Sequence, residues 1–189
     1  SLGDSSTSNG FGTRISTTGD MDLHAFNDVS AWENATLDSG GLVSVAVSES
    51  HLLHETNEAI IQIQDAALYS DSDVTLSALS DVRLDNKASA SSYGLAGLPS
   101  AIANATTDTQ NLIQLQDGAY LRTEGEVTLL AGQDAAGNQN QIDLDARSNI
   151  WNYTAVPLDG PGKSKASVVL DNSIDIEAGA TIESVLDVN

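Results

Sequence analysis

The sequence contains no cysteine, and aromatic residues make up only 4% of its 189 residues. Without cysteine, neither a disulfide framework nor a thiolate zinc site is available. A core that lacks large rings has to be filled by Val, Ile, Leu and Ala, which suits closely stacked strands better than a globule with wide gaps. No apolar run reaches the roughly 18 residues that a membrane-spanning helix needs, so membrane insertion is not expected.

Basic residues are also scarce: 7 Lys and Arg stand against 27 Asp and Glu, for a formal net charge of −20. Binding to DNA or RNA requires clustered Lys and Arg that neutralise phosphates, so a nucleic-acid partner is not expected. Binding to anionic membranes is disfavoured for the same reason. The acidity favours solubility of a strand-rich protein, and a specific cation-binding purpose is the alternative.

What the sequence does contain is an internal repeat. Residues 18–25 (TGDMDLHA), 71–78 (DSDVTLSA) and 124–131 (EGEVTLLA) are near copies, spaced by 53 residues, and a fourth copy starts at Asp187, 61 residues after the third. Apolar residues alternate within each copy, which is typical of a strand with one buried face. Aligned columns extend beyond these copies: Ile15, Leu68, Leu121 and Ile182 form one, and Thr17, Ser70, Thr123 and Ser184 another.

A long fixed period with strand signals predicts an all-β solenoid of the parallel β-helix type, in which Leu23, Leu76 and Leu129 stack inside. The short strands are joined by small-residue corners such as Ala66-Ala67 and Gly118-Ala119. Like charges in the column Asp20, Asp73, Glu126 and Asp187 would repel if they stood on every coil. We therefore expect two coils, or three short ones, in each repeat of about 53 residues. A β-sandwich is the alternative fold.

The predicted organisation is a linker or frayed coil at residues 1–12, followed by β-solenoid repeats at 13–189. Residues 27–39 look less regular than their neighbours, and no helix is expected. The last interval is longer by eight residues, which we place in residues 132–140 and 154–165.

The sequence resembles the repeats of large bacterial surface adhesins, the filamentous-haemagglutinin-like and related β-strand-repeat proteins. The resemblance is carried by GGLVSVAV at residues 40–47, IQIQDAA at 61–67 and DVTLSA at 73–78. It implies a right-handed parallel β-helix, secreted or displayed at a bacterial surface, with a role in adhesion, matrix or fibre formation. Expected partners are neighbouring repeats of the same chain, cell-surface glycans or matrix.

No catalytic signature is present, and we expect a protein that is not an enzyme and needs no cofactor. His51 and His54 have the spacing of two metal ligands on a helix but lack a third ligand. Acidic pairs such as Asp71/Asp73 and Asp143/Asp145 offer calcium ligands. Polysaccharide cleavage, the enzymatic alternative, would draw its carboxylates from Asp143, Asp145, Asp171 and Asp175.

Trp151 and Tyr153 are the candidate glycan contact, because alternate positions of a strand share a face and aromatic rings stack on sugars. The other interpretation is that the two rings cap the core beneath the Pro-containing insert. Neither end of the repeat array shows a polar capping coil, and open strand edges template association. We therefore expect further repeats of the same chain or head-to-tail assembly into a filament.

Overall fold

The computed structural model describes residues 12–189. These residues form nine strands: β1 (Thr13–Thr17), β2 (Met21–Ile63), β3 (Ala66–Ser70), β4 (Val74–Leu115), β5 (Tyr120–Thr123), β6 (Val127–Ala131), β7 (Gln141–Pro157), β8 (Gly162–Ile176) and β9 (Thr181–Ser184). The described residues include no helix that could cross a membrane. The regular structure of residues 12–189 consists of strands, so the chain is all β over this range.

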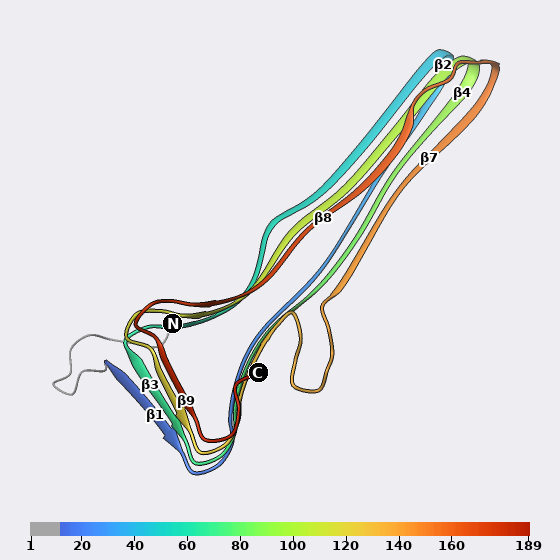
Figure 1. Ribbon diagram of the computed structural model, residues 1–189. Helices are drawn as coiled ribbons and strands as arrows, with labels where there is room; N and C mark the ends of the chain where they lie inside the picture. The colour runs from blue at the N-terminus through green and yellow to red at the C-terminus, as the bar shows by residue number, and fades with distance from the viewer. Residues whose placement is uncertain (1–11) are drawn as a thin grey trace.

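All pairing between these strands is parallel. A short sheet has the order β1-β3-β5-β9, and in a long sheet β2 pairs with β4, which also pairs with β6, β7 and β8. The chain thus runs along one path repeatedly, and each circuit, called a pass here, lies in parallel against the one before (Figure 1). Pass 1 contains β1 and β2, pass 2 contains β3 and β4, and pass 3 contains β5 to β8.

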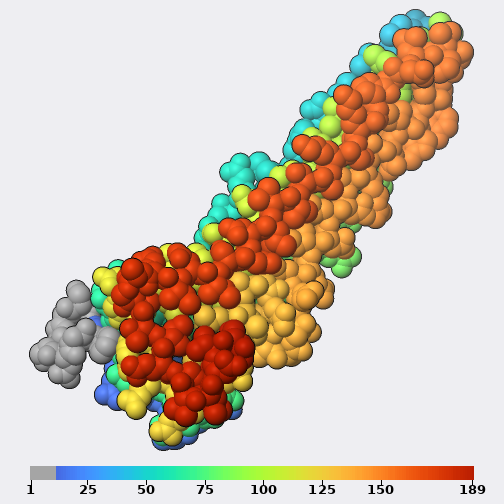
Figure 2. All heavy atoms as spheres, viewed as in Figure 1, coloured from blue at the N-terminus to red at the C-terminus, as the bar shows by residue number. Residues whose placement is uncertain are grey.

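Each pass is a wide base joined to a long, narrow arm (Figures 1 and 2). From the base a first limb runs out to the tip of the arm, and a second limb runs back. In pass 2 the chain turns at the tip around Gly94, whose φ is +129°. A Cβ atom there would lie 1.8 Å from the carbonyl oxygen of Gly41 in pass 1. Glycine is required at this point because stacked turns bring the two backbones together.

The apolar core of the base is made of inward columns that repeat from pass to pass. Leu23 pairs with Leu76 and Leu76 with Leu129, and Leu76 is fully buried. The predicted leucine stack is therefore confirmed. Ile15, Leu68, Leu121 and Ile182 form a second stack, as predicted. Both stacks belong to a single cluster.

In the half of the arm nearer the base, Val82 and Leu84 pack with Ala105. Toward the tip the core is thinner, because its inner positions are filled by small residues. Ala88 and Ala90 of the first limb lie in one buried cluster with Ala101 and Ala103 of the second limb. Alanine occupies every second position here, with Ser89 between the first two and Ile102 between the second two, so the period-two pattern persists without bulky inner side chains. Two limbs with such inner faces can pack closely along their length.

A polar layer of stacked amides and hydroxyls separates the core of the base from that of the arm. The Nδ2 of Asn111 donates to the Oδ1 of Asn172 at 2.8 Å and to that of Asn140 at 3.2 Å, while the Ser80 hydroxyl donates to Asn111 at 2.7 Å. Because Ser80 and Asn140 stand on the first limb and Asn111 and Asn172 on the second, these bonds connect both limbs and both passes. Buried polar groups are tolerated when they are satisfied in this way.

Hydroxyl groups connect the passes at the corner after the short sheet. Ser70 Oγ accepts a hydrogen bond from the Ser72 amide at 3.1 Å and donates to the carbonyl of Gly19 in pass 1 at 2.7 Å. Thr123 repeats this arrangement with the Gly125 amide and the carbonyl of Ser72. Ser184 likewise donates to the carbonyls of Asp187 in its own turn and Gly125 in the preceding one, at 2.8 and 2.7 Å. Thr17, in pass 1, closes its own turn by accepting from the Gly19 amide at 3.1 Å.

The predicted coil count is wrong. Met21 pairs directly with Val74, 53 positions later, so one repeat is one pass and the acidic column does stand on consecutive passes. Its carboxylates are engaged by neighbouring donors: Asp73 Oδ1 accepts from the Glu126 amide at 2.9 Å, and Asp20 accepts from the Ser72 hydroxyl. A hydrogen bond to a charged group contributes about 1.5–3 kcal/mol, enough to offset a repulsion of roughly 1 kcal/mol between exposed charges.

The expectation of short strands is also wrong for the long sheet, where β2 has 43 residues and β4 has 42. Residues 27–39, which look irregular in sequence, lie within β2 and pair in register with pass 2. The alternative β-sandwich is contradicted by the parallel pairing of all described strands. The predicted linker at 1–12 lies outside the described residues except for Gly12, whose amide donates to Asp65.

The eight extra residues lie in the two predicted segments. The pairing offset is 53 at Ala78 and Ala131, 60 at Asp81 and Gln141, and 61 at Ala101 and Gly162. Seven residues therefore enter between residues 131 and 141, and one enters at the tip. The seven form a loop in which Asp134 accepts from the Ala136 and Asn138 amides at 2.9 and 2.8 Å. The Asn138 side-chain amide, which also donates to Asp134, holds the pKa of that carboxyl below its ordinary value.

Replacing Leu76 with Asp should lower the free energy of unfolding by several kcal/mol, because it places an unpaired charge inside the stack. The matched control is Ser30→Asp, on the outer face of the same sheet beside Arg83. Urea unfolding followed by circular dichroism measures both. Wild-type stability of the Leu76→Asp variant would contradict the assigned core.

Candidate ligand-binding surfaces

The tip of the arm carries the predicted aromatic pair on its outer surface. Trp151 is 41% exposed and Tyr153 is 60% exposed, and neither belongs to the apolar clusters. Between them Asn152 points inward, donating to the carbonyls of Gly97 at 2.9 Å and Leu158 at 3.1 Å. Because strand residues alternate, fixing Asn152 inside places both rings outside. The interpretation that they cap the core is therefore wrong.

Tyr153 is not isolated on this surface. Its ring stacks on that of Tyr93 in pass 2, with centroids 5.1 Å apart and an interplanar angle of 7°. Trp151 pairs with Ser91, which is only 6% exposed. Further apolar residues surround the tip: Leu42, Val43, Leu95, Val156 and Leu158 are all at least 47% exposed. The tip is thus an exposed aromatic and aliphatic surface on a largely acidic protein.

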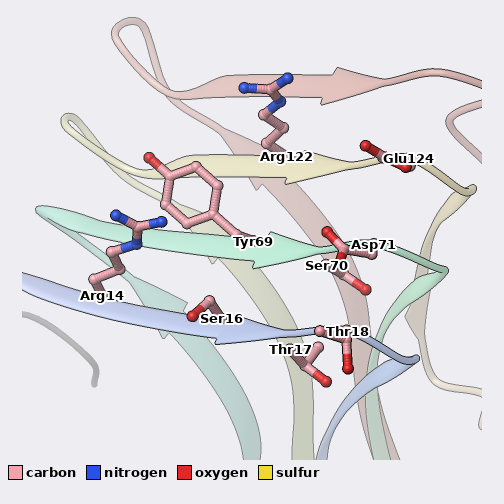
Figure 3. A pocket seen from close by; sticks show the side chains of 9 residues that line it. All are labelled: Arg14, Ser16, Thr17, Thr18, Tyr69, Ser70, Asp71, Arg122 and Glu124. Atoms are coloured by element: carbon pink, nitrogen blue, oxygen red, sulfur yellow. The ribbon is translucent and has the colours of Figure 1, made fainter.

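A second surface is a hollow of about 380 Å³ on the outer face of the short sheet. Figure 3 shows Tyr69 between Arg14 and Arg122, with Asp71 and Glu124 toward the other end of the strands. The register explains the grouping, since Ser16, Tyr69 and Arg122 face outward at one level of β1, β3 and β5. These residues stand beside the inward column of Ile15, Leu68 and Leu121, so the stack that forms the core also positions the hollow.

The charged groups of this hollow are held by rings and carboxylates. The guanidinium carbon of Arg14 lies 4.3 Å from the centre of the Tyr69 ring, and Tyr69 contacts Tyr120 at a centroid distance of 5.6 Å. Tyr120 donates its hydroxyl to Glu183 at 2.6 Å, and this bond raises the pKa of Tyr120 above its ordinary value. Arg122 lies 4.0 Å from the same Glu183.

The other candidate residues do not come together. His51 faces outward and hydrogen bonds to Asn104 at 3.0 Å, whereas His54 follows the buried inner column on the opposite face. Asp143 lies 3.9 Å from Arg83, and Asp145 pairs with Arg147. These cations disfavour calcium binding by the two carboxylates. Within residues 12–189, no three of His, Asp and Glu are close enough to hold a metal ion.

The four carboxylates considered for polysaccharide cleavage also lie apart. Asp143 and Asp145 extend from the outer face of β7, and Asp171 and Asp175 from the outer face of β8. The two limbs pack on each other through their inner faces, so the outer faces point away from one another. An acid and base pair would have to come from a single limb.

Sequence reasoning missed Tyr93, Arg14, Tyr69 and Arg122. A signal was available, because Tyr69 and Arg122 are 53 residues apart and each directly follows a core leucine. The columns that predicted the core therefore also align its outer neighbours. Tyr93 directly precedes Gly94, the residue that the sequence aligns with Gly41.

In comparisons with known proteins, no family model, curated protein or solved structure matches the chain.

If glycan binds at the tip, Trp151 and Tyr153 carry the contact, since exposed rings stack on the apolar faces of sugars. Replacing both with Ala should abolish binding of neutral oligosaccharides in a titration calorimetry screen. Trp32→Ala is the control, because that ring is 80% exposed on the same arm but stands apart from the stacked tyrosines. Unchanged binding by the double variant would remove the tip as the glycan site.

Proposed function

We propose that the chain is a structural or adhesive segment of a secreted bacterial surface protein or extracellular fibre, built as a right-handed parallel β-helix without catalytic turnover. The observation that carries the proposal is the continuous parallel pairing of β2 with β4, from Met21/Val74 to Ile63/Leu115, with one irregularity between His54 and Asn57. Such pairing makes a layered blade, long in the direction of its strands, to which each stacked pass adds a layer. The surface of such a blade is suited to display and contact.

Other features support this role. The resemblance of residues 40–47, 61–67 and 73–78 to bacterial adhesin repeats points the same way. The net charge of −20 discourages side-by-side clumping of strand-rich blades. The exposed apolar tip gives the arm a contact surface of the apolar character that binding sites have.

Head-to-tail assembly with a second copy is supported by the open face of the last pass. Val168, Leu170, Ile174 and Ile176 are 43–48% exposed. Their partners in pass 2 are the buried inner residues Thr107, Thr109, Ile113 and Leu115, which lie between pass 1 and pass 3. An uncovered strand edge also offers unpaired backbone groups for another strand. A further repeat of the same chain would cover this face in the same manner.

The register allows the pairs across such a contact to be named. Glu49, Ile102 and Lys163 occupy one column. If β8 of one copy docks on β2 of the next in the same register, Lys163 lies beside Glu49 of the second copy. In this contact β1 of the second copy has to move aside, because β9 already pairs with β5. The same alignment brings Asp171 near Glu58, a repulsive pair, so the apolar columns have to supply most of the stability.

Charge reversal tests this contact. Lys163→Glu and Glu49→Lys should each weaken assembly several-fold, because an exposed charge pair contributes about 0.2–1 kcal/mol and turns repulsive on reversal. Mixing or combining the two changes should restore it. Sedimentation velocity and electron microscopy report the assembly, with Val168→Asp/Leu170→Asp as the strong disruption. Monomers at all concentrations in the wild-type protein would contradict head-to-tail assembly.

Polysaccharide processing is the competing function, because the β-helix also serves enzymes that cleave glycans. Incubation with acidic and neutral glycans should release no reducing ends and no unsaturated-sugar absorbance. Turnover that disappears in Asp143→Asn or Asp171→Asn variants would overturn the structural assignment. Turnover that persists in both variants would indicate a contaminating enzyme. The destabilised Leu76→Asp variant, purified in parallel, should then show the same turnover.

A further inference from the structure

The hollow on the outer face of the short sheet brings together groups that differ from the rest of the surface. Only 7 of the 189 residues are basic, yet two arginines, Arg14 and Arg122, line one hollow with Tyr69. Figure 3 shows the two guanidinium groups on either side of the tyrosine. The small side chain of Ser16, at the same level as Tyr69, leaves the space open.

The four arginines of the chain differ in their ion pairs, and among the described residues neither arginine of the hollow makes a close one. Arg147 makes a bidentate pair with Asp145, and Arg83 lies 3.9 Å from Asp143. Arg122 reaches Glu183 only at 4.0 Å, and Arg14 forms no ion pair within residues 12–189, where its contact is the Tyr69 ring. A guanidinium has five N–H donors. Both side chains therefore keep donors for a ligand.

The lining of the hollow selects the kind of anion. Asp71 and Glu124 stand beyond the arginines, and Ser16, Thr17 and Thr18 add hydroxyl groups. A polyanion or a phosphate cluster would be repelled by the two carboxylates and by the net charge of −20. A ligand with one carboxylate beside several neutral hydroxyls fits both ends of the hollow. The arginine end suits its carboxylate, and the carboxylates and hydroxyls of the protein at the other end can hydrogen bond to its hydroxyl groups.

We propose that this hollow binds a glycan through a single carboxylate-bearing sugar residue, such as a hexuronic acid flanked by neutral sugars. Arg122 holds the sugar carboxylate through charge-assisted hydrogen bonds, and Arg14, on the other side of the Tyr69 ring, donates to hydroxyl oxygens of the sugar. Tyr69 forms the apolar wall against the sugar ring. Asp71 and the hydroxyl groups of Ser16 and Thr18 bind the sugar hydroxyls at the other end.

This inference names a ligand class for the proposed adhesive role and rests on that role only for its biological meaning. Binding at this hollow is measured on the isolated chain and does not require assembly. If the wild-type protein forms filaments but does not bind the sugar, the proposed sugar site is wrong and the assembly stands. If the protein binds the sugar but forms no filaments, the proposed assembly is wrong and the sugar site stands.

Methyl glucuronide and methyl glucoside are the matched probes, since they differ only in the carboxylate. Titration followed by NMR chemical shifts should give a dissociation constant of about 1 mM for the glucuronide, as expected for a small ligand on a shallow site. Binding of the glucoside should be at least about 10-fold weaker, and binding of the glucuronide should weaken as salt is raised. A polyuronate should bind no more tightly per residue than the monosaccharide.

Arg122→Gln should reduce glucuronide affinity at least about 10-fold, because it removes the charge-assisted contact to the carboxylate, and Arg14→Gln should reduce it several-fold, because it removes donors to the sugar hydroxyls. Arg83→Gln, an exposed arginine on the long sheet, should leave affinity unchanged. The Arg122 side chain is 60% exposed, so its variant keeps the fold, which thermal melting verifies. Equal binding of the two probes, wild-type affinity in Arg122→Gln, or loss only in Trp151→Ala/Tyr153→Ala would each overturn the site.

Discussion

Parallel backbone pairing at a fixed offset is the interaction on which the rest of the structure depends. Side chains alternate with a period of two, so a slip of one residue would move every inner side chain of a pass to the outside. The stacks of Leu76 and Leu68 with their neighbours in the base hold the register there. Between the base and the arm, the hydrogen bond from Asn111 to Asn172 connects successive passes at the same level. Register is thus maintained by bulk in the base and by polar pairing beside it.

Close stacking also determines where small residues are required. Parallel strands lie about 4.8 Å apart, so any atom added between successive turns meets the backbone or side chain of the next pass. A Cβ atom at Gly118 would lie 2.4 Å from Asp65 Oδ1, and one at Gly179 would lie 2.0 Å from Asp117 Oδ1. Glycine at these corners accommodates the aspartate of the preceding pass. Each corner aspartate therefore depends on the glycine that lies against it in the next pass.

The core could be predicted from sequence because a repeat aligns its own inner columns, as Leu23, Leu76 and Leu129 do. The length of one pass could not be predicted in this way. Residues 27–39 have Asn27, Val29, Ala31 and Glu33 at alternate inner positions, and this mixed set shows no apolar period by itself. The repulsion argument failed for a different reason, since it counted the charges of Asp20 and Asp73 without the hydrogen bonds that the corner supplies. Both errors concern partners that only the folded chain brings together.

The exposed surfaces show the same division. Trp151 and Tyr153 could be assigned to one face by alternation, but Tyr93 joins them only through the stacking of passes. Arg14 reaches Tyr69 along a diagonal between neighbouring strands, a contact for which the sequence carries no local pattern. Outer columns are free of the packing constraint that makes inner columns similar, so their chemistry changes from pass to pass. The surfaces are therefore assembled from unlike residues at a constant spacing.

The central claim, one pass per 53-residue repeat, is tested most directly by a disulfide. Ser30 and Arg83 are partners on the outer face, and adjacent parallel strands bring their Cα atoms within the about 4.4–6.8 Å that a disulfide requires. Because the chain has no cysteine of its own, Ser30→Cys/Arg83→Cys introduces a single pair, and Ser30→Cys/Lys87→Cys is the off-register control. Under mild oxidation the account predicts an intramolecular disulfide in the first variant and none in the control. Free thiols in both variants, as two coils per repeat would produce, would contradict it.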